Sequence, residues 1–199
     1  GQIAGRFLRY SGVPVTVLDV DPEIIEIVRR LGMQVYYGDA SRLDLLHAAG
    51  CARAKLFILA VDDADKSLEI AATVQEHFPH LRILARAADR PHYYRLRAMG
   101  ITDVVRETFG SALQLGQLGL MALGTRAHHA HRTAQLFKAH DDAMIERLAT
   151  VYGSVERTAF FDEARRAFEQ LESTMRSEVA SAHASDKGWD GEGQSQARQ

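Results

Sequence analysis

Short apolar segments rich in β-branched residues alternate with amphipathic helical segments over the first half of the chain, and this alternation constrains the fold most strongly. The apolar segments lie at residues 13–18, 33–37, 56–61, 81–85 and 101–105. Strands that alternate with helices at this spacing predict a parallel sheet with helices on both faces. The continuous apolar run at 56–61 is typical of a central parallel strand that is covered on both faces.

The start of the chain already has a helical pattern. Ile3, Phe7 and Leu8 recur at helical spacing, and we expect them to form the inner face of a first helix. Gly1 is not preceded by methionine, so we expect the natural protein to have an N-terminal part that comes before it. The next helix is predicted to begin at Pro22, with Asp21 as its N-cap.

The second half of the chain differs in character. The segment 108–124 has no charged residue and includes Gly110, Gly116 and Gly119, which predicts a helix packed closely on a partner. We expect a homodimer built partly on its face with Leu113, Leu118, Leu120 and Met121. Segments 126–152 and 160–179 have helical patterns, and Ser, Gly, Gln and Asp dominate after Ala180.

These patterns together predict an α/β chain: a Rossmann-like, doubly wound parallel sheet with a C-terminal helical appendage and a disordered tail. The expected divisions are a nucleotide-binding domain over 1–123, which includes the uncharged helix, a helical subdomain over 124–180, and a disordered tail over 181–199.

Composition excludes some classes of function. The net charge of −2 gives no indication of a nucleic-acid partner or of an anionic membrane surface as a binding site. A single cysteine, Cys51, excludes an internal disulfide framework and suits a reducing compartment.

In a doubly wound sheet, ligands bind beyond the carboxyl ends of the strands. Asp19 closes one predicted strand and can accept hydrogen bonds from both hydroxyls of a ribose. It follows Gly1 at close to the ~20-residue spacing of the dinucleotide fingerprint, in which Gly1 would be the third glycine, the one that allows close packing of helix on strand. The alternative role for Asp19 is a cap for the helix at Pro22.

Asp39 follows the next strand and could accept a hydrogen bond from an adenine amine, with Gly38 and Ala40 leaving room for the base; the alternative is helix capping. Arg86 and Arg106 end later strands, where each could hold a phosphate or carboxylate or could instead form a surface ion pair. The candidate nucleotide-binding residues are Gly1, Asp19, Asp21, Gly38, Asp39, Ala40, Asp62 and Arg86.

No pair of residues suggests a catalytic nucleophile and its base. His128 and His131 could face the same way on a helix, but no thiolate or carboxylate nearby completes a metal site, so a solvated helix face is favoured. Asp62 and Asp63 could bind magnesium, although a loop and helix cap is commoner. A nucleotide site without a reaction centre favours a sensor over an enzyme. The alternative is the cofactor domain of an NAD-dependent oxidoreductase, which would need a second domain with an acid–base residue.

Several segments resemble the carboxy-terminal regulatory domain of Kef proteins, the glutathione-gated potassium efflux systems of Gram-negative bacteria. The resemblance extends from Gly1 to about Val151 and weakens beyond. The segments that carry it are 1–6 (GQIAGR), 17–22 (VLDVDP), 32–40 (GMQVYYGDA), 76–81 (EHFPHL) and 106–109 (RETF).

The resemblance implies a Rossmann-fold KTN (or RCK) domain, a homodimer, and a membrane antiporter domain in the same polypeptide at the cytoplasmic face of the bacterial inner membrane. It implies AMP or NAD(H) as the nucleotide and glutathione or its adducts as the regulatory ligand. By position, Arg6 and Arg106 match the family's glutathione-binding arginines, and the family's asparagine falls at Asp141. A soluble flavin-dependent ancillary subunit is a further partner of some members.

Overall fold

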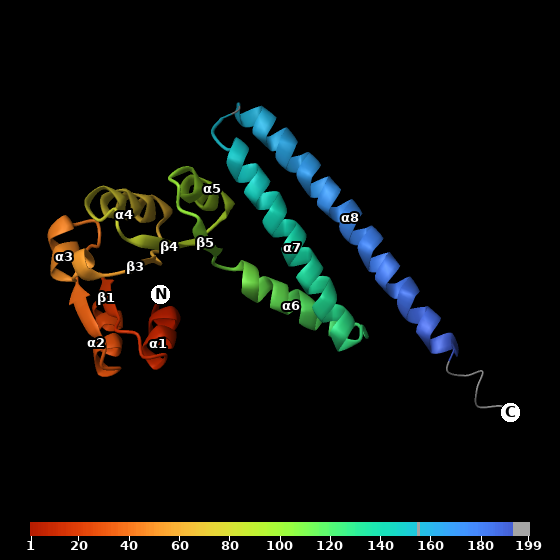
Figure 1. Ribbon diagram of the computed structural model, residues 1–199, viewed down its shortest axis with the longest axis horizontal. Helices are drawn as coiled ribbons and strands as arrows, with labels where there is room; N and C mark the ends of the chain where they lie inside the picture. The colour runs from red at the N-terminus through yellow and green to blue at the C-terminus, as the bar shows by residue number, and fades with distance from the viewer. Residues whose placement is uncertain (155, 193–199) are drawn as a thin grey trace. The chain divides into compact units, whose positions relative to one another are not determined.

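The computed structural model describes residues 1–154 and 156–192 and divides the chain into two compact units (Figure 1). The first unit is Gly1–Glu107, and the second begins at Thr108. The sequence assigned the uncharged helix near 108–124 to the first domain. In the structure this helix packs against the helix that follows it, so it belongs to the second unit.

The first unit alternates strands with helices along its whole length. Its strands are β1 (Thr16–Asp19), β2 (Gln34–Tyr37), β3 (Leu56–Leu59), β4 (Arg82–Ala87) and β5 (Asp103–Arg106). Its helices are α1 (Gln2–Tyr10), α2 (Pro22–Arg30), α3 (Leu43–Ala48), α4 (Ala64–His77) and α5 (Arg90–Ala98), with a short 3₁₀ turn, η1, at Cys51–Arg53. The prediction of an α/β unit with parallel strands is confirmed.

Every strand pair is parallel, and the described strands form two ladders. β1 pairs with β2, with Asp19 opposite Tyr37. β4 lies between β3 and β5 in a second ladder, with Leu59 opposite Ala85. Helix α2 packs on β1 and β2, α4 packs on β3, and α5 packs on β4 and β5. The described strands therefore form two separate hydrogen-bonded sheets: α2 covers the first, and α4 and α5 cover the second.

Aspartates fix the starts of three helices that follow strands. Asp21 caps α2 by accepting hydrogen bonds from Glu23 and Ile24, as the sequence predicted. Asp63 caps α4, and Asp89 caps α5. The turns after β1, β3 and β4 are consequently fixed by hydrogen bonds, and the candidate residues Asp21 and Asp62 lie within them.

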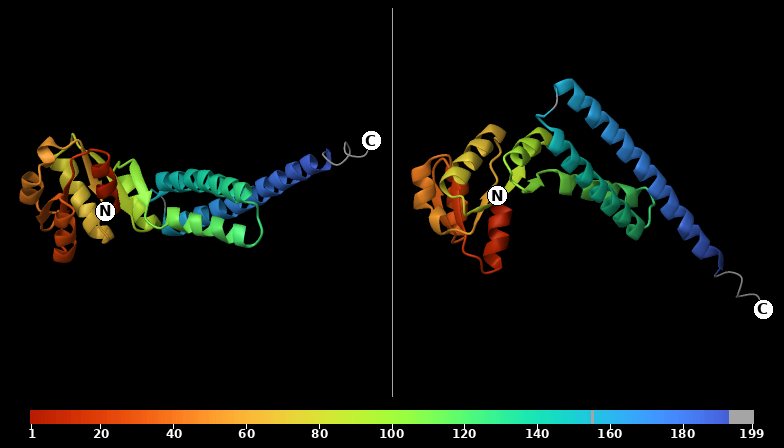
Figure 2. Two further views of the ribbon diagram at one scale, coloured as in Figure 1. Left: turned by 90° about the horizontal axis from the view of Figure 1, so that it is seen from below. Right: turned by 45° about the horizontal axis from the view of Figure 1, so that its top comes forward.

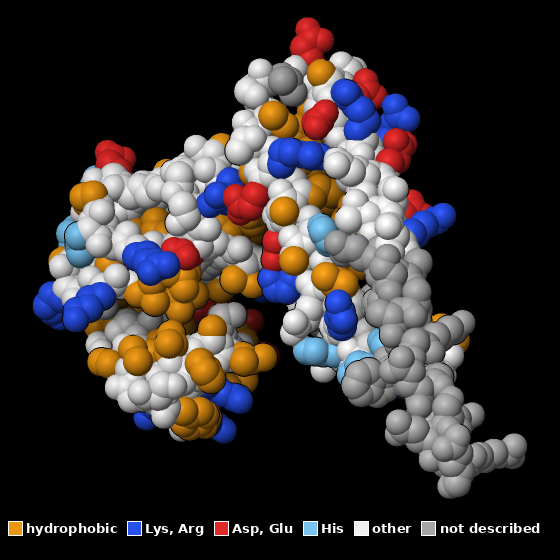
Figure 3. All heavy atoms as spheres, turned by 45° about the vertical axis from the view of Figure 1, so that its right-hand side comes forward, with side chains coloured by type: hydrophobic (Ala, Val, Ile, Leu, Met, Phe, Trp, Pro, Cys, Tyr) orange, Lys and Arg blue, Asp and Glu red, His pale blue; other side chains and the backbone are white. Residues whose placement is uncertain are grey.

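Two expectations about burial are wrong. Ile3 and Phe7 are 80% and 71% exposed, because α1 instead turns Gly5 inward, where a Cβ would lie 3.8 Å from the side chain of Val15. β3 is buried on one face only: Leu59 is buried, whereas alternate residues Leu56 and Ile58 remain partly exposed. Figure 3 shows hydrophobic side chains that reach the molecular surface.

The second unit contains three helices, α6 (Phe109–Ala122), α7 (Ala127–Val151) and α8 (Arg157–Glu192). α7 packs against both α6 and α8, and Figure 2 shows α7 and α8 side by side. Ala130, Ala134 and Leu148 are buried on α7. None of the helices in the described part of the chain is long and apolar enough to cross a membrane.

The composition after Ala180 predicts a disordered tail, whereas α8 continues as far as Glu192. The last part of the predicted tail, 193–199, lies outside the described residues.

Candidate nucleotide site at the strand ends

The ends of β1 and β2 are joined by a backbone hydrogen bond, which brings the two main candidate carboxylates into one region. The backbone oxygen of Asp19 accepts from the Gly38 N–H at 2.9 Å. The half-buried Asp19 side chain accepts from the Asp21 N–H at 3.0 Å through Oδ1. Among the described residues Oδ2 of Asp19 has no hydrogen-bond partner, so it can accept from a ligand hydroxyl.

Gly38 adopts a backbone conformation that favours glycine. Its φ is 148°, and a Cβ at this position would lie 2.3 Å from Cδ1 of Leu45. A side chain on residue 38 would therefore be strained by the backbone conformation and would force the Leu45 side chain to move. This close approach fixes the backbone that leads into Asp39 and Ala40, both half-buried.

Asp39 lies in a compact cluster of charged and polar groups. Its Oδ1 accepts from the Ser41 N–H at 2.8 Å, and its Oδ2 lies 2.9 Å from the Lys66 ammonium. Hydrogen bonds from Lys66 and then from Ser41 lower the pKa of Asp39 to about 2, while burial opposes them. Asp39 is thus ionised throughout the physiological pH range and can act only as an acceptor.

Arg86 is held by its neighbours at the next strand end. It donates to the carboxylate of Glu107 at 2.7 Å and to the backbone oxygen of Ala60 at 3.0 Å, and it also pairs with Asp62. A phosphate at Arg86 would have to share the guanidinium with these groups. The ion-pair alternative is the arrangement in the structure.

Gly1 lies in the same neighbourhood. A Cβ on Gly1 would lie 3.4 Å from the Cβ of Ala60, so the start of α1 packs tightly on the segment after β3. Gly1 also lies close to the charged side chains of Arg86, Asp62 and Asp19.

The three residues matched to a glutathione site lie in different units. Arg6 is exposed on α1, and Arg106 is half-buried at the end of β5. Asp141 belongs to α7 of the second unit, where it is 1% exposed.

The candidate metal ligands do not form a centre. No group of three or more His, Cys, Asp or Glu side chains in the described residues is arranged to hold a metal ion. The rings of His128 and His129 lie 3.9 Å apart, and His131 is hydrogen bonded to Gln135. Asp63 serves as the cap of α4.

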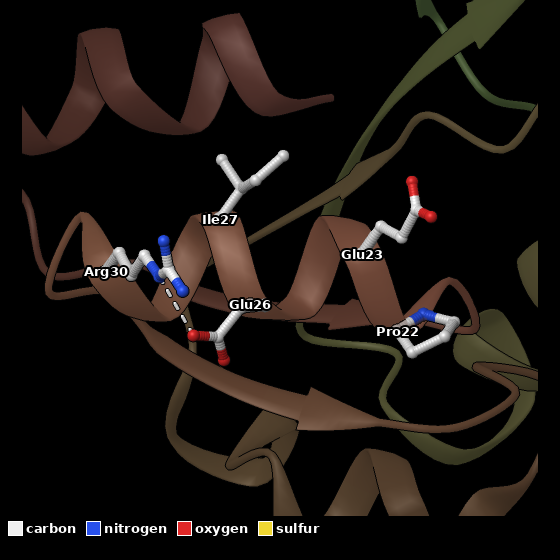
Figure 4. A pocket seen from close by; sticks show the side chains of 5 residues that line it. All are labelled: Pro22, Glu23, Glu26, Ile27 and Arg30. Atoms are coloured by element: carbon white, nitrogen blue, oxygen red, sulfur yellow. Dashed lines mark hydrogen bonds and ion pairs between the residues drawn. The ribbon is translucent and has the colours of Figure 1, made fainter.

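A separate hollow lies on the outer surface of α2 (Figure 4). It is lined by Pro22, Glu23, Glu26, Ile27 and Arg30, and Glu26 pairs with Arg30 across it. All five residues come from one helix, and none is a candidate nucleotide residue. We therefore regard it as a surface feature of α2.

Lys66, Ser41 and Glu107 also lie at the strand ends, and the sequence pattern did not predict their roles there. A lysine in the first turn of a helix opposes the helix dipole, and this unfavourable placement was a signal that a carboxylate lies close to Lys66. Glu107 was noted only within a longer motif, because the residue after a strand carries no periodic signal.

The geometry defines a chain with a Rossmann-like α/β unit followed by a helical unit. Residues 1–107 match the model of the TrkA-N domain, and residues 111–190 match that of the potassium efflux system KefB C-terminal domain. The chain belongs to the TrkA-N family, and the two matches together identify it as a Kef-type regulatory domain.

Relatives agree with this assignment. The chain is 45% identical over 179 residues to the glutathione-regulated potassium-efflux system protein KefC of Escherichia fergusonii and to that of Escherichia coli O139:H28. The match covers 90% of this chain and only 28% of each relative.

Solved structures agree as well. The Kef C-terminal domain of Shewanella denitrificans, in an AMP-bound form, is 42% identical with a TM-score of 0.71, over 76% of this chain and 92% of that one. The TrkA-N domain of the Escherichia coli inner membrane protein YbaL is 24% identical with a TM-score of 0.55, over 59% of this chain and 87% of that one, and shows the fold alone.

Proposed function

We propose that the chain is the ligand-binding regulatory domain of a potassium/proton antiporter and acts at the cytoplasmic face of the bacterial inner membrane. It binds an adenine nucleotide and responds to glutathione or its adducts, acting through binding rather than catalysis. The family membership, the potassium-efflux relatives and the AMP-bound form of the Shewanella domain support this proposal.

The observation that carries the nucleotide proposal is the hydrogen bond between the Gly38 N–H and the Asp19 backbone oxygen, which joins two acceptor side chains at adjacent strand ends. Asp19 offers Oδ2 to the ribose hydroxyls, and the ionised Asp39 accepts from the exocyclic amine of adenine. Gly1, Gly38 and Ala40 allow close approach of the backbone, while Asp21 holds Asp19 in place. AMP and NAD(H) share the adenosine that this arrangement recognises.

Calorimetric titration of the purified chain with AMP tests the site. Asp19→Ala removes a charged acceptor and should weaken AMP binding about tenfold or more. Asp103→Ala is the matched control, because Asp103 begins β5 at the opposite edge of the sheet and pairs with Arg82 there. Equal AMP affinity in the wild type and Asp19→Ala would reject the ribose site.

For the regulatory ligand we propose Arg6, Arg106 and Asp141 as contacts of glutathione. A guanidinium can hold each of the two glutathione carboxylates in bidentate fashion. The ionised form of Asp141 only accepts hydrogen bonds, whereas an asparagine at this position could also donate one, so Asp141 is the least favourable of the three contacts for a glutathione carboxylate.

We propose the remaining partners, a second copy of the chain, a membrane domain and an ancillary subunit, on the basis of the same family membership. We propose a homodimer that uses the face of α6, where no residue is buried within the described chain. In this proposal, ligand binding to this domain controls the membrane antiporter domain of the same polypeptide. A soluble flavin-dependent ancillary subunit is a further partner.

A further inference from the structure

Lys66 is the centre of the polar cluster next to Asp39. Its ammonium lies 2.9 Å from Oδ2 of Asp39, donates to Oγ of Ser41 at 2.9 Å and donates to Oε2 of Glu69 at 3.0 Å. Asp63 positions this lysine by accepting from its backbone N–H at 2.7 Å. The cluster thus links the turn after β2 to the first turn of α4.

All three hydrogen-bond donors of the Lys66 ammonium have acceptors within this cluster. A lysine ammonium has three N–H donors and no acceptor. Asp39, Ser41 and Glu69 take one donor each. Ser41 also donates its backbone N–H to Asp39 at 2.8 Å. Every N–H donor of the Lys66 ammonium is therefore used within the cluster, and Oγ of Ser41 accepts one of them.

Acceptor capacity remains after those donors are used. Each carboxylate oxygen has two lone-pair sites, so Asp39 and Glu69 can each accept further hydrogen bonds. Asp39 is 38% exposed, so a ligand can reach its unused lone pairs. The Lys66, Asp39 and Glu69 side chains accordingly offer a base further acceptors and no unused N–H donor.

We infer that Lys66, by directing all three of its N–H donors to Asp39, Ser41 and Glu69, makes this edge of the site specific for a purine with an exocyclic amine over one with a keto oxygen. This inference rests on the proposed adenine site at Asp39. An amine finds an acceptor there, whereas a keto oxygen meets carboxylate lone pairs without a donor to offset their repulsion. Lys66 is a specificity-determining residue that acts through the groups it saturates.

Substitution of Glu69 tests the inference by leaving one N–H donor of Lys66 without its acceptor. Glu69→Ala removes one acceptor and leaves one Lys66 N–H available to a keto oxygen. Its side chain is largely exposed on α4, so the fold should tolerate the change. Glu76→Ala is the matched control, because Glu76 lies near the other end of the same helix and contacts His77 instead.

The test compares the affinities of AMP and inosine monophosphate by calorimetry at pH 7; inosine monophosphate has a keto oxygen in place of the exocyclic amine and carries a proton on N1. The wild type should prefer AMP by about tenfold or more. In Glu69→Ala the preference should fall several-fold, mainly through tighter inosine monophosphate binding, while Glu76→Ala keeps the wild-type ratio. The double variant Glu69→Ala with Lys66→Met should regain the preference, because the unsatisfied donor is gone.

The outcomes separate this inference from the proposed site. An unchanged ratio in Glu69→Ala, or a lost preference that Lys66→Met does not restore, overturns the role of Lys66 even if AMP binds. Failure of the wild type to bind AMP, or undiminished AMP affinity in Asp39→Ala, overturns the adenine site itself and the inference with it.

Discussion

The guanidinium of Arg86 donates to the carboxylate of Glu107 at 2.7 Å, which ties the end of β4 to the residue that follows β5. A backbone bond from the Glu107 N–H to the Ala87 oxygen, 2.9 Å long, lies next to it. Arg86 is only 23% exposed, and its Nε is buried without a hydrogen-bond partner among the described residues. The ion pair with Glu107 therefore contributes more to the stability of the fold than the ion pair of a fully exposed arginine would.

Glu107→Gln should destabilise the protein by about 1 kcal/mol, because it removes a charge-assisted hydrogen bond from a mostly buried guanidinium. Urea denaturation followed by circular dichroism measures the change. Asp44→Asn is the matched control, since Asp44 and Arg42 form a close pair with both side chains 65% exposed. Its unfolding midpoint should not move. Equal midpoint shifts in the two variants would show that burial at Arg86 has no energetic consequence.

Gly38→Ala should cost more stability than Gly100→Ala. Both glycines have positive φ, 148° and 82°, so alanine is strained at either position, by about 1 kcal/mol or more. Only Gly38 also faces a close contact, 2.3 Å from Leu45, whereas a Cβ on Gly100 meets nothing within 4 Å. Thermal denaturation of the two variants separates strain from the clash. The same melting temperature for both variants would mean that the Leu45 side chain moves aside without a loss of stability.

His92 should make the protein less stable at acid pH. Its ring is 1% exposed, its Nδ1 accepts from the Ala88 N–H at 3.2 Å, and burial is the main cause that lowers its pKa. Below the ordinary pKa of 6.5 the unfolded chain binds a proton that the folded chain resists, so the free energy of unfolding falls as pH decreases and levels off below the folded pKa.

Denaturation between pH 7.5 and 5 checks this prediction. His92→Asn keeps an acceptor near Ala88 but cannot titrate, so its stability should depend less on pH than that of the wild type. His80→Asn serves as the control, because His80 is exposed. A wild-type pH slope that survives in His92→Asn would assign the acid sensitivity to another group.

Sequence patterns predicted the elements of the first unit because strand and helix periodicities and aspartate caps are local. The N-cap role of Asp21 followed from Pro22 alone, without tertiary information. The exposure of Ile3 and Phe7 could not be read in the same way, because a helix with a glycine face and an apolar face can bury either one. Tertiary packing of Gly5 on Val15 decides between them.

In the candidate site, too, the residues marked by local patterns were predicted, and those brought in by tertiary contacts were not. Asp19 and Asp39 were found because strand ends mark the ligand edge of a doubly wound sheet. Their partners were not found, since Lys66 is separated from Asp39 by the whole of α3 and β3, and Glu107 follows Arg86 only after α5 and β5. Contacts between distant segments have no periodic signal in a single sequence.

A homodimer on the α6 face should dissociate in Leu118→Glu. Leu118 is 50% exposed on a helix without a charged residue, and a buried glutamate in an apolar contact is costly. Sedimentation velocity at tens of micromolar with AMP present should change from dimer to monomer. Ile27→Glu is matched in exposure, at 48%, and lies on α2, so it should remain dimeric. A wild-type monomer under these conditions would contradict the proposed dimer.

Asp141 should weaken the binding of glutathione to this chain. The resemblance to Kef proteins places an asparagine there, which can donate to and accept from a peptide, whereas an ionised aspartate only accepts. Asp141 is 1% exposed, so its side chain has little room to turn away, and in its ionised form it would repel a glutathione carboxylate placed beside it. We therefore expect glutathione to bind this chain more weakly than it binds Asp141→Asn.

Calorimetry with reduced glutathione on the wild type, Arg106→Ala and Asp141→Asn checks this expectation. Arg106→Ala removes a bidentate partner of a carboxylate and should weaken binding about tenfold, while Asp141→Asn should strengthen it. Asp142→Asn is the control for charge alone, because Asp142 is the adjacent residue on α7 and pairs with Lys138. It should leave glutathione affinity unchanged, since its charge is already compensated. If all four proteins bind glutathione equally, the ligand is held by residues other than Arg106 and Asp141, because a ligand cannot respond to groups with which it makes no differential contact.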